Sequence, residues 1–149
     1  MSFSVTVRVL RPSDLDAIAA IDEKITGTAR QEYYQYRLEV AGRSDTQLNA
    51  SLVAEADGKV VGFLMGTLYF ARFGIPETSA MVDALGVDPE AQDRGVGSAL
   101  AEQFRSNMKA ARVEKIYTLV DWADSDLLKF FGNQGFVPSQ RLSLECRVF

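Results

Sequence analysis

A strand, a glycine-bearing turn and a helix follow one another directly in residues 78–112, and this segment most limits the possible folds. Residues 78–87 are predicted to form a strand, which Asp88 and Pro89 end. A helix is expected from 95 to about 112, because apolar residues recur there at helical spacing: Val96, Leu100, Phe104, Met108 and Ala111. A strand that leads straight into an amphipathic helix indicates the α/β class.

The same patterns predict the other elements. Strands are expected at 5–10, 51–56, 59–70, 116–120 and 141–149, and helices at 14–25, 30–41 and 125–134. Asp57-Gly58 lies between two strand-like runs, which predicts a hairpin, and the run after it is apolar on both faces, as in a central strand. The order β-α-α-β-β-β-α-β-α-β places a three-strand meander among crossover units, so the sheet should be mixed.

Composition excludes several classes of protein and site. With 149 residues, the chain is expected to form one domain, 1–149. The net charge of −4 argues against a nucleic-acid partner, and no apolar run approaches the roughly 20 residues of a membrane helix. The chain has no histidine and one cysteine, Cys146, which excludes histidine-based catalysis and a cysteine-cluster metal site. No metal and a cytoplasmic location are therefore expected.

The turn before the 95–112 helix suits a phosphate. The first N–H groups of a helix are unpaired and carry the positive end of its dipole, and Gly95 and Gly97 would let the backbone approach a ligand. The Walker A sequence is missing, and Leu100 stands where a dinucleotide fingerprint has its third glycine. From the two glycines alone, a helix start with glycines chosen for packing remains an equal alternative.

The wider pattern resembles a known family. Leu85-x-Val87-x-Pro89, followed by Gln92-x-x-Gly95-x-Gly97, is similar to the acetyl-CoA pyrophosphate loop of the GNAT N-acetyltransferase superfamily. The order of the elements agrees, as does the ending Asn133-Gln134-Gly135-Phe136. The resemblance covers essentially the whole chain. It implies a mixed, mostly antiparallel central sheet flanked by helices, and transfer of an acetyl group from acetyl-CoA to an amine.

The resemblance also implies where the cofactor binds. The pyrophosphate would lie on the turn, the pantetheine arm would add along the 85–87 backbone, and a backbone N–H there would polarise the thioester carbonyl. The cofactor-binding residues expected on this basis are Leu85, Gly86, Val87, Gln92, Asp93, Arg94, Gly95, Val96, Gly97 and Ser98. Asp93 stands where the family often has glycine and should point outward. Arg94 would either reach a phosphate or be solvated.

The chain departs from the family at the last helix. A tyrosine there commonly protonates the leaving thiolate, but the corresponding residue is Phe131, which cannot. Asp124 corresponds to a family asparagine near the cofactor, although a helix N-cap is its simpler interpretation. Both are expected to lie beside acetyl-CoA. The usual general acid is thus missing.

Two aspartates are candidate bases for the acceptor amine. Asp83 lies on the strand that meets the thioester, and its alternative is a solvated or paired strand residue. Asp121 follows the 116–120 strand and is either a second base or a substrate anchor. Beside it, Trp122 could contact the acceptor, although tryptophan is more often found in the core. Tyr33 and Tyr34 lie on the helix that lines the acceptor site in this family.

Three functions remain open. The first is an acetyl-CoA-dependent N-acetyltransferase acting on a small-molecule or peptide amine. The second is a CoA-binding regulatory or sensor domain with little catalysis, which Phe131 suggests, and the third is an interaction module with a degenerate loop. A homodimer is expected through the 141–149 strand, since that strand would leave one bare edge while its apolar residues Leu142, Leu144, Cys146 and Val148 cover the core.

Overall fold

The structure, a computed structural model, describes residues 3–41, 50–69 and 77–149. Residues 1–2, 42–49 and 70–76, which include the last residue of the strand expected at 59–70, lie outside the described residues. The chain divides into two compact units, Met1–Leu119 and Val120–Phe149.

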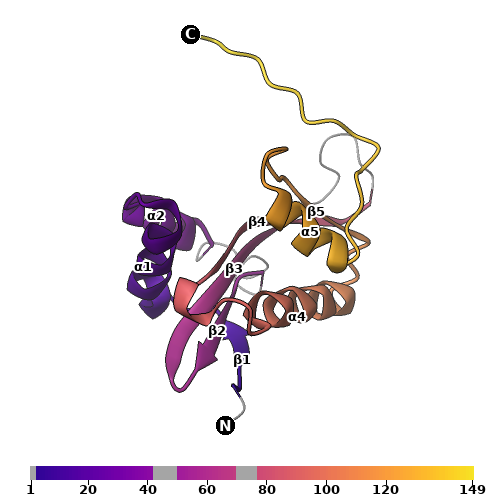
Figure 1. Ribbon diagram of the computed structural model, residues 1–149. Helices are drawn as coiled ribbons and strands as arrows, with labels where there is room; N and C mark the ends of the chain where they lie inside the picture. Colours follow the sequence, from indigo (N-terminus) through magenta and orange to yellow (C-terminus); the bar gives the residue numbers. More distant parts are fainter. Residues whose placement is uncertain (1–2, 42–49, 70–76) are drawn as a thin grey trace. The chain divides into compact units, whose positions relative to one another are not determined.

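The first unit contains a five-stranded sheet. Its strands follow the chain order β1 (Thr6–Val9), β2 (Leu52–Ala56), β3 (Lys59–Tyr69), β4 (Ser79–Val87) and β5 (Lys115–Thr118) (Figure 1). The first three pairs of neighbours are antiparallel, and β4 and β5 are parallel. The expected mixed, mostly antiparallel sheet is confirmed.

The hairpin expected at Asp57-Gly58 joins β2 to β3. Asp57 has φ 54° and Gly58 has φ 73°, so both turn residues are left-handed. Positive φ at both central residues is the type I′ geometry, whose twist matches that of the flanking strands. Asp and Gly tolerate this conformation, which is why these two residues fix the register of the hairpin.

Helices cover both faces of this sheet (Figure 1). A 3₁₀ turn η1 (Pro12–Asp14), α1 (Leu15–Thr26) and α2 (Gln31–Ala41) belong to one face, and α4 (Val96–Ala110) belongs to the other. On the first face a core cluster joins Leu10, Ile18, Ile21, Tyr34, Val53, Phe63 and Met65. On the other face Gly62 and Gly66 lie against Val96 and Phe104 of α4. Since β3 is buried on both faces, its predicted central position is confirmed.

The second unit contains α5 (Ser125–Asn133). Asp124 caps this helix, since its carboxylate accepts a hydrogen bond from the Leu127 N–H at 3.1 Å. Phe131 packs edge-to-face against Phe130 and Phe136, with ring centroids 5.3 and 5.0 Å apart. This small aromatic cluster holds the end of the helix to the residues that follow it.

The strand expected at 141–149 is not formed, so the final β of the expected order is wrong for this structure. Leu142, Leu144 and Val148 are 82, 88 and 84% exposed, and Cys146 is exposed as well. Apolar residues at every second position give a segment one apolar face, but the segment forms a strand only where its backbone N–H and C=O groups pair with a neighbouring strand. The segment is extended (Figure 1), and its apolar side chains Leu142, Leu144 and Val148 are exposed rather than buried.

Within the described ranges, no helix has the length and apolar character needed to cross a bilayer. Nor do the cysteine, aspartate and glutamate side chains of those ranges form a group of three or more that could hold a metal ion.

Candidate active site

Strands β4 and β5 part after four residue pairs. Their parallel register runs from Ser79 opposite Lys115 to Val82 opposite Thr118, and the Thr118 hydroxyl donates to the Val82 carbonyl at 3.0 Å where the pairing ends. The strand β4 continues for five more residues, to Val87, and the register given for the described residues pairs none of them with β5. One edge of the 83–87 backbone therefore has no strand partner among the described residues, which is the arrangement that an extended ligand needs for pairing.

A bulge in β4 lies at the start of this opening. Met65 of β3 faces Ala84, and the next residue, Gly66, faces Val82, so Asp83 is the extra residue on β4. A bulge bends its strand and re-aims the side chain of the extra residue. Here that side chain is the predicted base.

Gly86 is fixed by close packing. A Cβ atom at this position would lie 2.6 Å from Cε1 of Phe63 and 3.2 Å from Cδ1 of Ile25. No side chain fits there without displacing the Phe63 ring, which belongs to the core. The glycine thus allows the β4 backbone to lie directly on that ring.

Asp88 fixes the first part of the turn after β4 to α1 and to β3. Its carboxylate accepts from the Glu90 N–H at 3.0 Å and from Lys24 of α1 at 3.1 Å, and its own N–H donates to the Val61 carbonyl at 2.8 Å. The bond from Glu90, and then Lys24, hold the pKa of Asp88 below its usual value against the opposing effect of burial. A short 3₁₀ turn, η3 (Pro89–Ala91), follows, and the Gln92 amide donates to the Val87 carbonyl at 3.3 Å.

The second part of the turn presents open backbone at the start of α4. Gly95, the N-cap, has φ 80° and offers no side-chain cap, and a Cβ atom on it would meet nothing within 4 Å. The first intrahelical bond runs from the Ala99 N–H to the Gly95 carbonyl. The N–H groups of Val96 and Gly97 precede this bond, so they have no acceptor within the helix and lie at the positive end of its dipole.

Two charged residues flank these N–H groups. Asp93 is exposed and has φ 62°, a conformation that favours glycine and that aspartate tolerates better than most residues. Arg94 is exposed, and its guanidinium carbon lies 4.9 Å from the centroid of the Phe3 ring. The guanidinium is therefore stacked on an aromatic ring in this structure.

Asp83 is paired rather than solvated. Nη2 of Arg37, on α2, donates to Oδ2 of Asp83 at 2.7 Å, and the Thr67 hydroxyl of β3 donates to the same oxygen. The Arg37 Nη2 also donates to Thr67 at 3.2 Å, and Nη1 donates to the Tyr33 hydroxyl at 3.4 Å. Burial disfavours the charged form of Arg37, but the hydrogen bond and the negative charge of Asp83 favour it more strongly. The pKa of Arg37 therefore lies above its usual value.

The tyrosines of α2 have different environments. Tyr34 is 1% exposed, packs on Phe63, and donates its hydroxyl to Asp22 at 2.9 Å, so it is a core residue rather than a wall of an open site. Burial, and then the bond to Asp22, raise the pKa of Tyr34. Tyr33 and Tyr36 are 42 and 64% exposed. Of the two tyrosines expected to contact the acceptor, only Tyr33 is open to a ligand.

The remaining expected residues lie in the second unit. Asp121 is exposed and accepts a weak bond from the Ala123 N–H, at 3.4 Å. Trp122 is 89% exposed, so it is not the core residue that tryptophan usually is. Asp124 serves as the helix cap, and Phe131 is buried in its aromatic cluster.

Sequence reasoning missed Arg37 and Thr67. Arg37 lies one helical turn after Tyr33, on the helix expected to line the acceptor site, and this spacing was the available signal. Nothing in the sequence links it to Asp83, 46 residues further along the chain.

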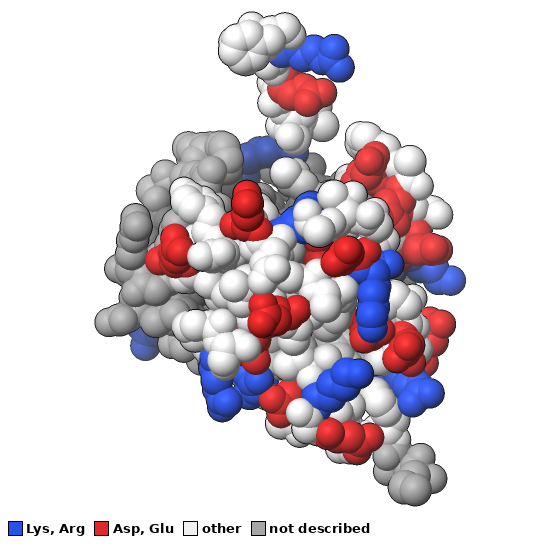
Figure 2. All heavy atoms as spheres, turned by 90° about the vertical axis from the view of Figure 1, so that its left-hand side faces the viewer, with Lys and Arg blue, Asp and Glu red and all other residues white. Residues whose placement is uncertain are grey.

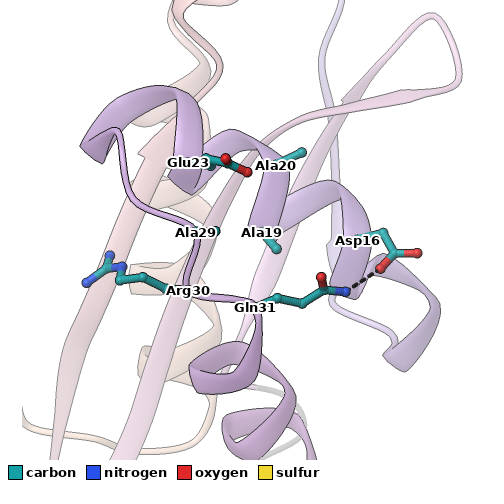
Figure 3. A pocket seen from close by; sticks show the side chains of 7 residues that line it. All are labelled: Asp16, Ala19, Ala20, Glu23, Ala29, Arg30 and Gln31. Carbon is teal, nitrogen blue, oxygen red and sulfur yellow. Dashed lines mark hydrogen bonds between the residues drawn. The ribbon is translucent and has the colours of Figure 1, made fainter.

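A shallow pocket of about 300 Å³ lies elsewhere, between α1 and the segment that leads into α2 (Figure 3). Alanines line it together with polar side chains, and Gln31 donates to Asp16 across its rim: Asp16, Ala19, Ala20, Glu23, Ala29, Arg30 and Gln31. None of the expected site residues lines this pocket. On the side of the first unit that α1 and α2 form, acidic and basic side chains are mixed (Figure 2).

The comparisons with known proteins agree with this geometry. The model of the acetyltransferase (GNAT) family matches residues 15–136. A phosphinothricin N-acetyltransferase of Alcaligenes faecalis is 39% identical over 101 residues, which cover 64% of this chain and 50% of that relative. The chain thus aligns with about half the length of this curated relative.

Solved structures share the fold. An aminoglycoside N-acetyltransferase AAC(6')-Iy in complex with CoA matches with a TM-score of 0.82 and 14% identity, covering 100% of this chain and 98% of that one. Ard1 from Thermoplasma volcanium matches with a TM-score of 0.75 and 23% identity, covering 91 and 84%. At such identities the likeness shows the fold alone.

Proposed function

Because the chain belongs to the GNAT acetyltransferase family, we propose that it transfers an acetyl group from acetyl-CoA to a primary amine by direct attack in a ternary complex. One observation carries this proposal: the edge of β4 that opens after Val82 leads directly into the uncapped start of α4. An extended thioester and its pyrophosphate need these two features side by side, the first for pairing and the second for charge.

In the proposed complex the pyrophosphate accepts hydrogen bonds from backbone N–H groups of the turn 92–98. The pantetheine arm runs along Leu85, Gly86 and Val87, and an N–H near Gly86 or Val87 polarises the thioester carbonyl. The 14%-identical aminoglycoside acetyltransferase was solved with CoA, which supports acetyl-CoA as the donor. No metal takes part in this proposal.

The chemistry needs two proton transfers. The amine nitrogen, once neutral, attacks the carbonyl carbon, a C–N bond forms, and the C–S bond breaks as the thiolate leaves. Asp83, or a water that it holds, is the proposed acceptor of the amine proton, with Asp121 as the alternative. Phe131 offers no proton, so water or another hydroxyl is proposed to protonate the thiolate.

The acceptor is proposed to be a small-molecule amine, as the names of the phosphinothricin and aminoglycoside acetyltransferases suggest. Tyr33 is its proposed contact, together with Trp122. A peptide amine remains the alternative, and the cytoplasm is the proposed location.

Two measurements test the proposed function. Calorimetry should show one saturable site for acetyl-CoA, and thiol release over a panel of phosphinothricin, neamine, spermidine and a lysine peptide should reveal turnover. Gly97→Asp should abolish cofactor binding in a folded protein, because it adds bulk and negative charge where the phosphates lie. Gly97→Ala adds less bulk and no charge, so it should lose less affinity for acetyl-CoA. Unchanged affinity in Gly97→Asp would exclude this site.

A homodimer through residues 141–149 is proposed as well. β5 ends the strand order, and the described residues pair no strand with its outer edge, while Leu142, Leu144 and Val148 are left exposed. An unpaired edge and an extended segment with one apolar face favour association with a second copy. Light scattering at tens of micromolar should give a dimer mass, and deletion of 141–149 should give a folded monomer, because these side chains are exposed and bury no apolar surface. A monomeric mass for the full chain would contradict the dimer.

A further inference from the structure

We infer that Arg37 is a positioning residue of the acceptor site, which holds the Asp83 carboxylate so that one of its two oxygens is kept for the incoming amine. The inference rests on the proposed function. It concerns a residue of α2 that the sequence pattern did not single out. The argument for it starts from the one carboxylate oxygen of Asp83 that accepts the hydrogen bonds of Arg37 and Thr67.

Both donors to Asp83 act on the same atom. Arg37 and Thr67 donate to Oδ2, and no hydrogen bond to Oδ1 is found among the described residues. The Asp83 side chain is only 14% exposed, yet the described residues contain no fully buried polar side-chain atom without a partner. Among the described residues, Oδ1 therefore has no donor and is not fully buried, so solvent can reach it. An ammonium group can replace that solvent.

The carboxylate is held from three directions. The bulge in β4 sets its backbone, Thr67 holds it from β3, and Arg37 reaches it from α2. Arg37 also donates to Tyr33, the exposed tyrosine proposed to contact the acceptor. One guanidinium thus links the proposed base to the proposed wall of the site, and its planar fork of donors suits this role in a way that a lysine ammonium does not.

The position of α2 does not depend on Arg37 alone. Arg30, just before the helix, forms an ion pair with Asp22 of α1 at 2.6 Å, and Tyr34 donates to the same aspartate. The Asp22 cluster is a separate anchor between α1 and α2. Loss of Arg37 should therefore disturb the carboxylate and Tyr33 while the helix stays in place.

The test compares Arg37→Met with Arg37→Lys in steady-state kinetics on the amine that the wild type turns over best. Arg37→Met should raise KM for the amine or lower kcat, with a combined loss in kcat/KM for the amine of about ten- to hundredfold, the size expected for a lost hydrogen bond to a charged group. KM for acetyl-CoA should stay within about twofold. Arg37→Lys should restore part of the loss, because it keeps the charge but not the fork.

Arg8→Met is the matched structural control. Arg8 lies on β1, at the first edge of the sheet, and is as buried as Arg37, with 19 against 23% of its side chain exposed. It pairs with Asp14 of η1 and Glu55 of β2. The Arg8→Met substitution should lower Tm without changing KM for the amine. Equal losses of kcat/KM for the amine in Arg8→Met and Arg37→Met would overturn the inference. An equal rise of KM for the amine and for acetyl-CoA in Arg37→Met would overturn it as well.

A double-mutant cycle separates this inference from the proposed function. Arg37→Met and Asp83→Asn, singly and combined, should show non-additive changes in the free energy of unfolding, whether or not the protein is active. If the wild type acetylates no amine, the proposed function fails, and the inference about acceptor positioning fails with it. If the wild type is active but the two substitutions are additive, only the inference is overturned.

Discussion

Arg37 and Asp83 form an ion pair with 2.7 Å between Nη2 and Oδ2, so the proposed base is already bound to a cation before any substrate arrives. The pair joins α2 to the bulged strand beside the opening between β4 and β5. Of the two interpretations of Asp83 that the sequence left open, base or paired residue, the structure shows the pairing. The free Oδ1 keeps a role toward the amine compatible with it.

The first prediction concerns this carboxylate. Asp83→Asn keeps the shape of the side chain but removes its charge, and it should lower kcat/KM by about 10²–10⁴-fold, the usual contribution of a general base. Asp121→Asn, measured in parallel, should cost much less. A loss under about threefold in Asp83→Asn, with a large loss in Asp121→Asn, would move the base to Asp121.

The second prediction concerns the turn. Asp93 has φ 62° and brings a negative charge next to the proposed phosphate site. Asp93→Gly should raise Tm and tighten acetyl-CoA binding by roughly two- to fivefold, the size of an exposed charge effect. Asp93→Ala removes the charge but keeps a side chain at positive φ, so it should tighten binding while lowering Tm. Calorimetry and thermal melts check both, and weaker binding in both variants would show that Asp93 contacts the cofactor favourably.

The third prediction concerns the missing general acid. Phe131 is 6% exposed and packs between Phe130 and Phe136, so Phe131→Tyr adds a hydroxyl that must find a partner or cost about 1–3 kcal/mol. Turnover should rise or stay unchanged while Tm falls. Loss of all activity with intact acetyl-CoA binding would show instead that the site requires an apolar ring.

The fourth prediction concerns acid stability. The hydrogen bonds from Arg30, and less strongly from Tyr34, hold the pKa of the buried Asp22 below its usual 3.8 despite the cost of burial. The folded state therefore binds fewer protons than the unfolded state in this range, and the stability that Asp22 contributes is complete above about pH 4 and is lost as the pH falls through its folded-state pKa. Asp22→Asn should lower the free energy of unfolding at pH 6 by about 1–2 kcal/mol and reduce its loss toward pH 3.

Asp16→Asn is the control for this effect. Asp16 is exposed on the same helix and bonds only to the Gln31 amide among the described residues. Urea unfolding at pH 6 and pH 3 should give nearly wild-type values for this variant. Equal pH dependence in Asp22→Asn and the wild type would contradict the role assigned to Asp22.

Local patterns in the sequence predicted much of the fold. The Asp57-Gly58 turn, the buried face of α4 and the Asp124 cap each depend on residues close in sequence. The spacing of apolar residues and the turn and cap preferences of single residues were therefore enough to predict them. The strand at 141–149 failed because alternation says nothing about whether a neighbour exists to pair with. Arg37 and Asp83 could not be linked because their contact depends on how α2 packs on the sheet. Tyr33 and Tyr34 differ by one position on a helix, and only the packing shows which of them is buried.

The most direct test of the central claim is to follow both products in one reaction. With acetyl-CoA and an amine from the panel, the protein should release CoA thiol and form acetylated amine in equal amounts, and Gly97→Asp should form neither. Mass spectrometry of the amine and a thiol assay on the same sample measure the two. Thiol release without acetylated amine, or saturable acetyl-CoA binding with no product from any amine tested, would contradict acetyl transfer as the function of this site.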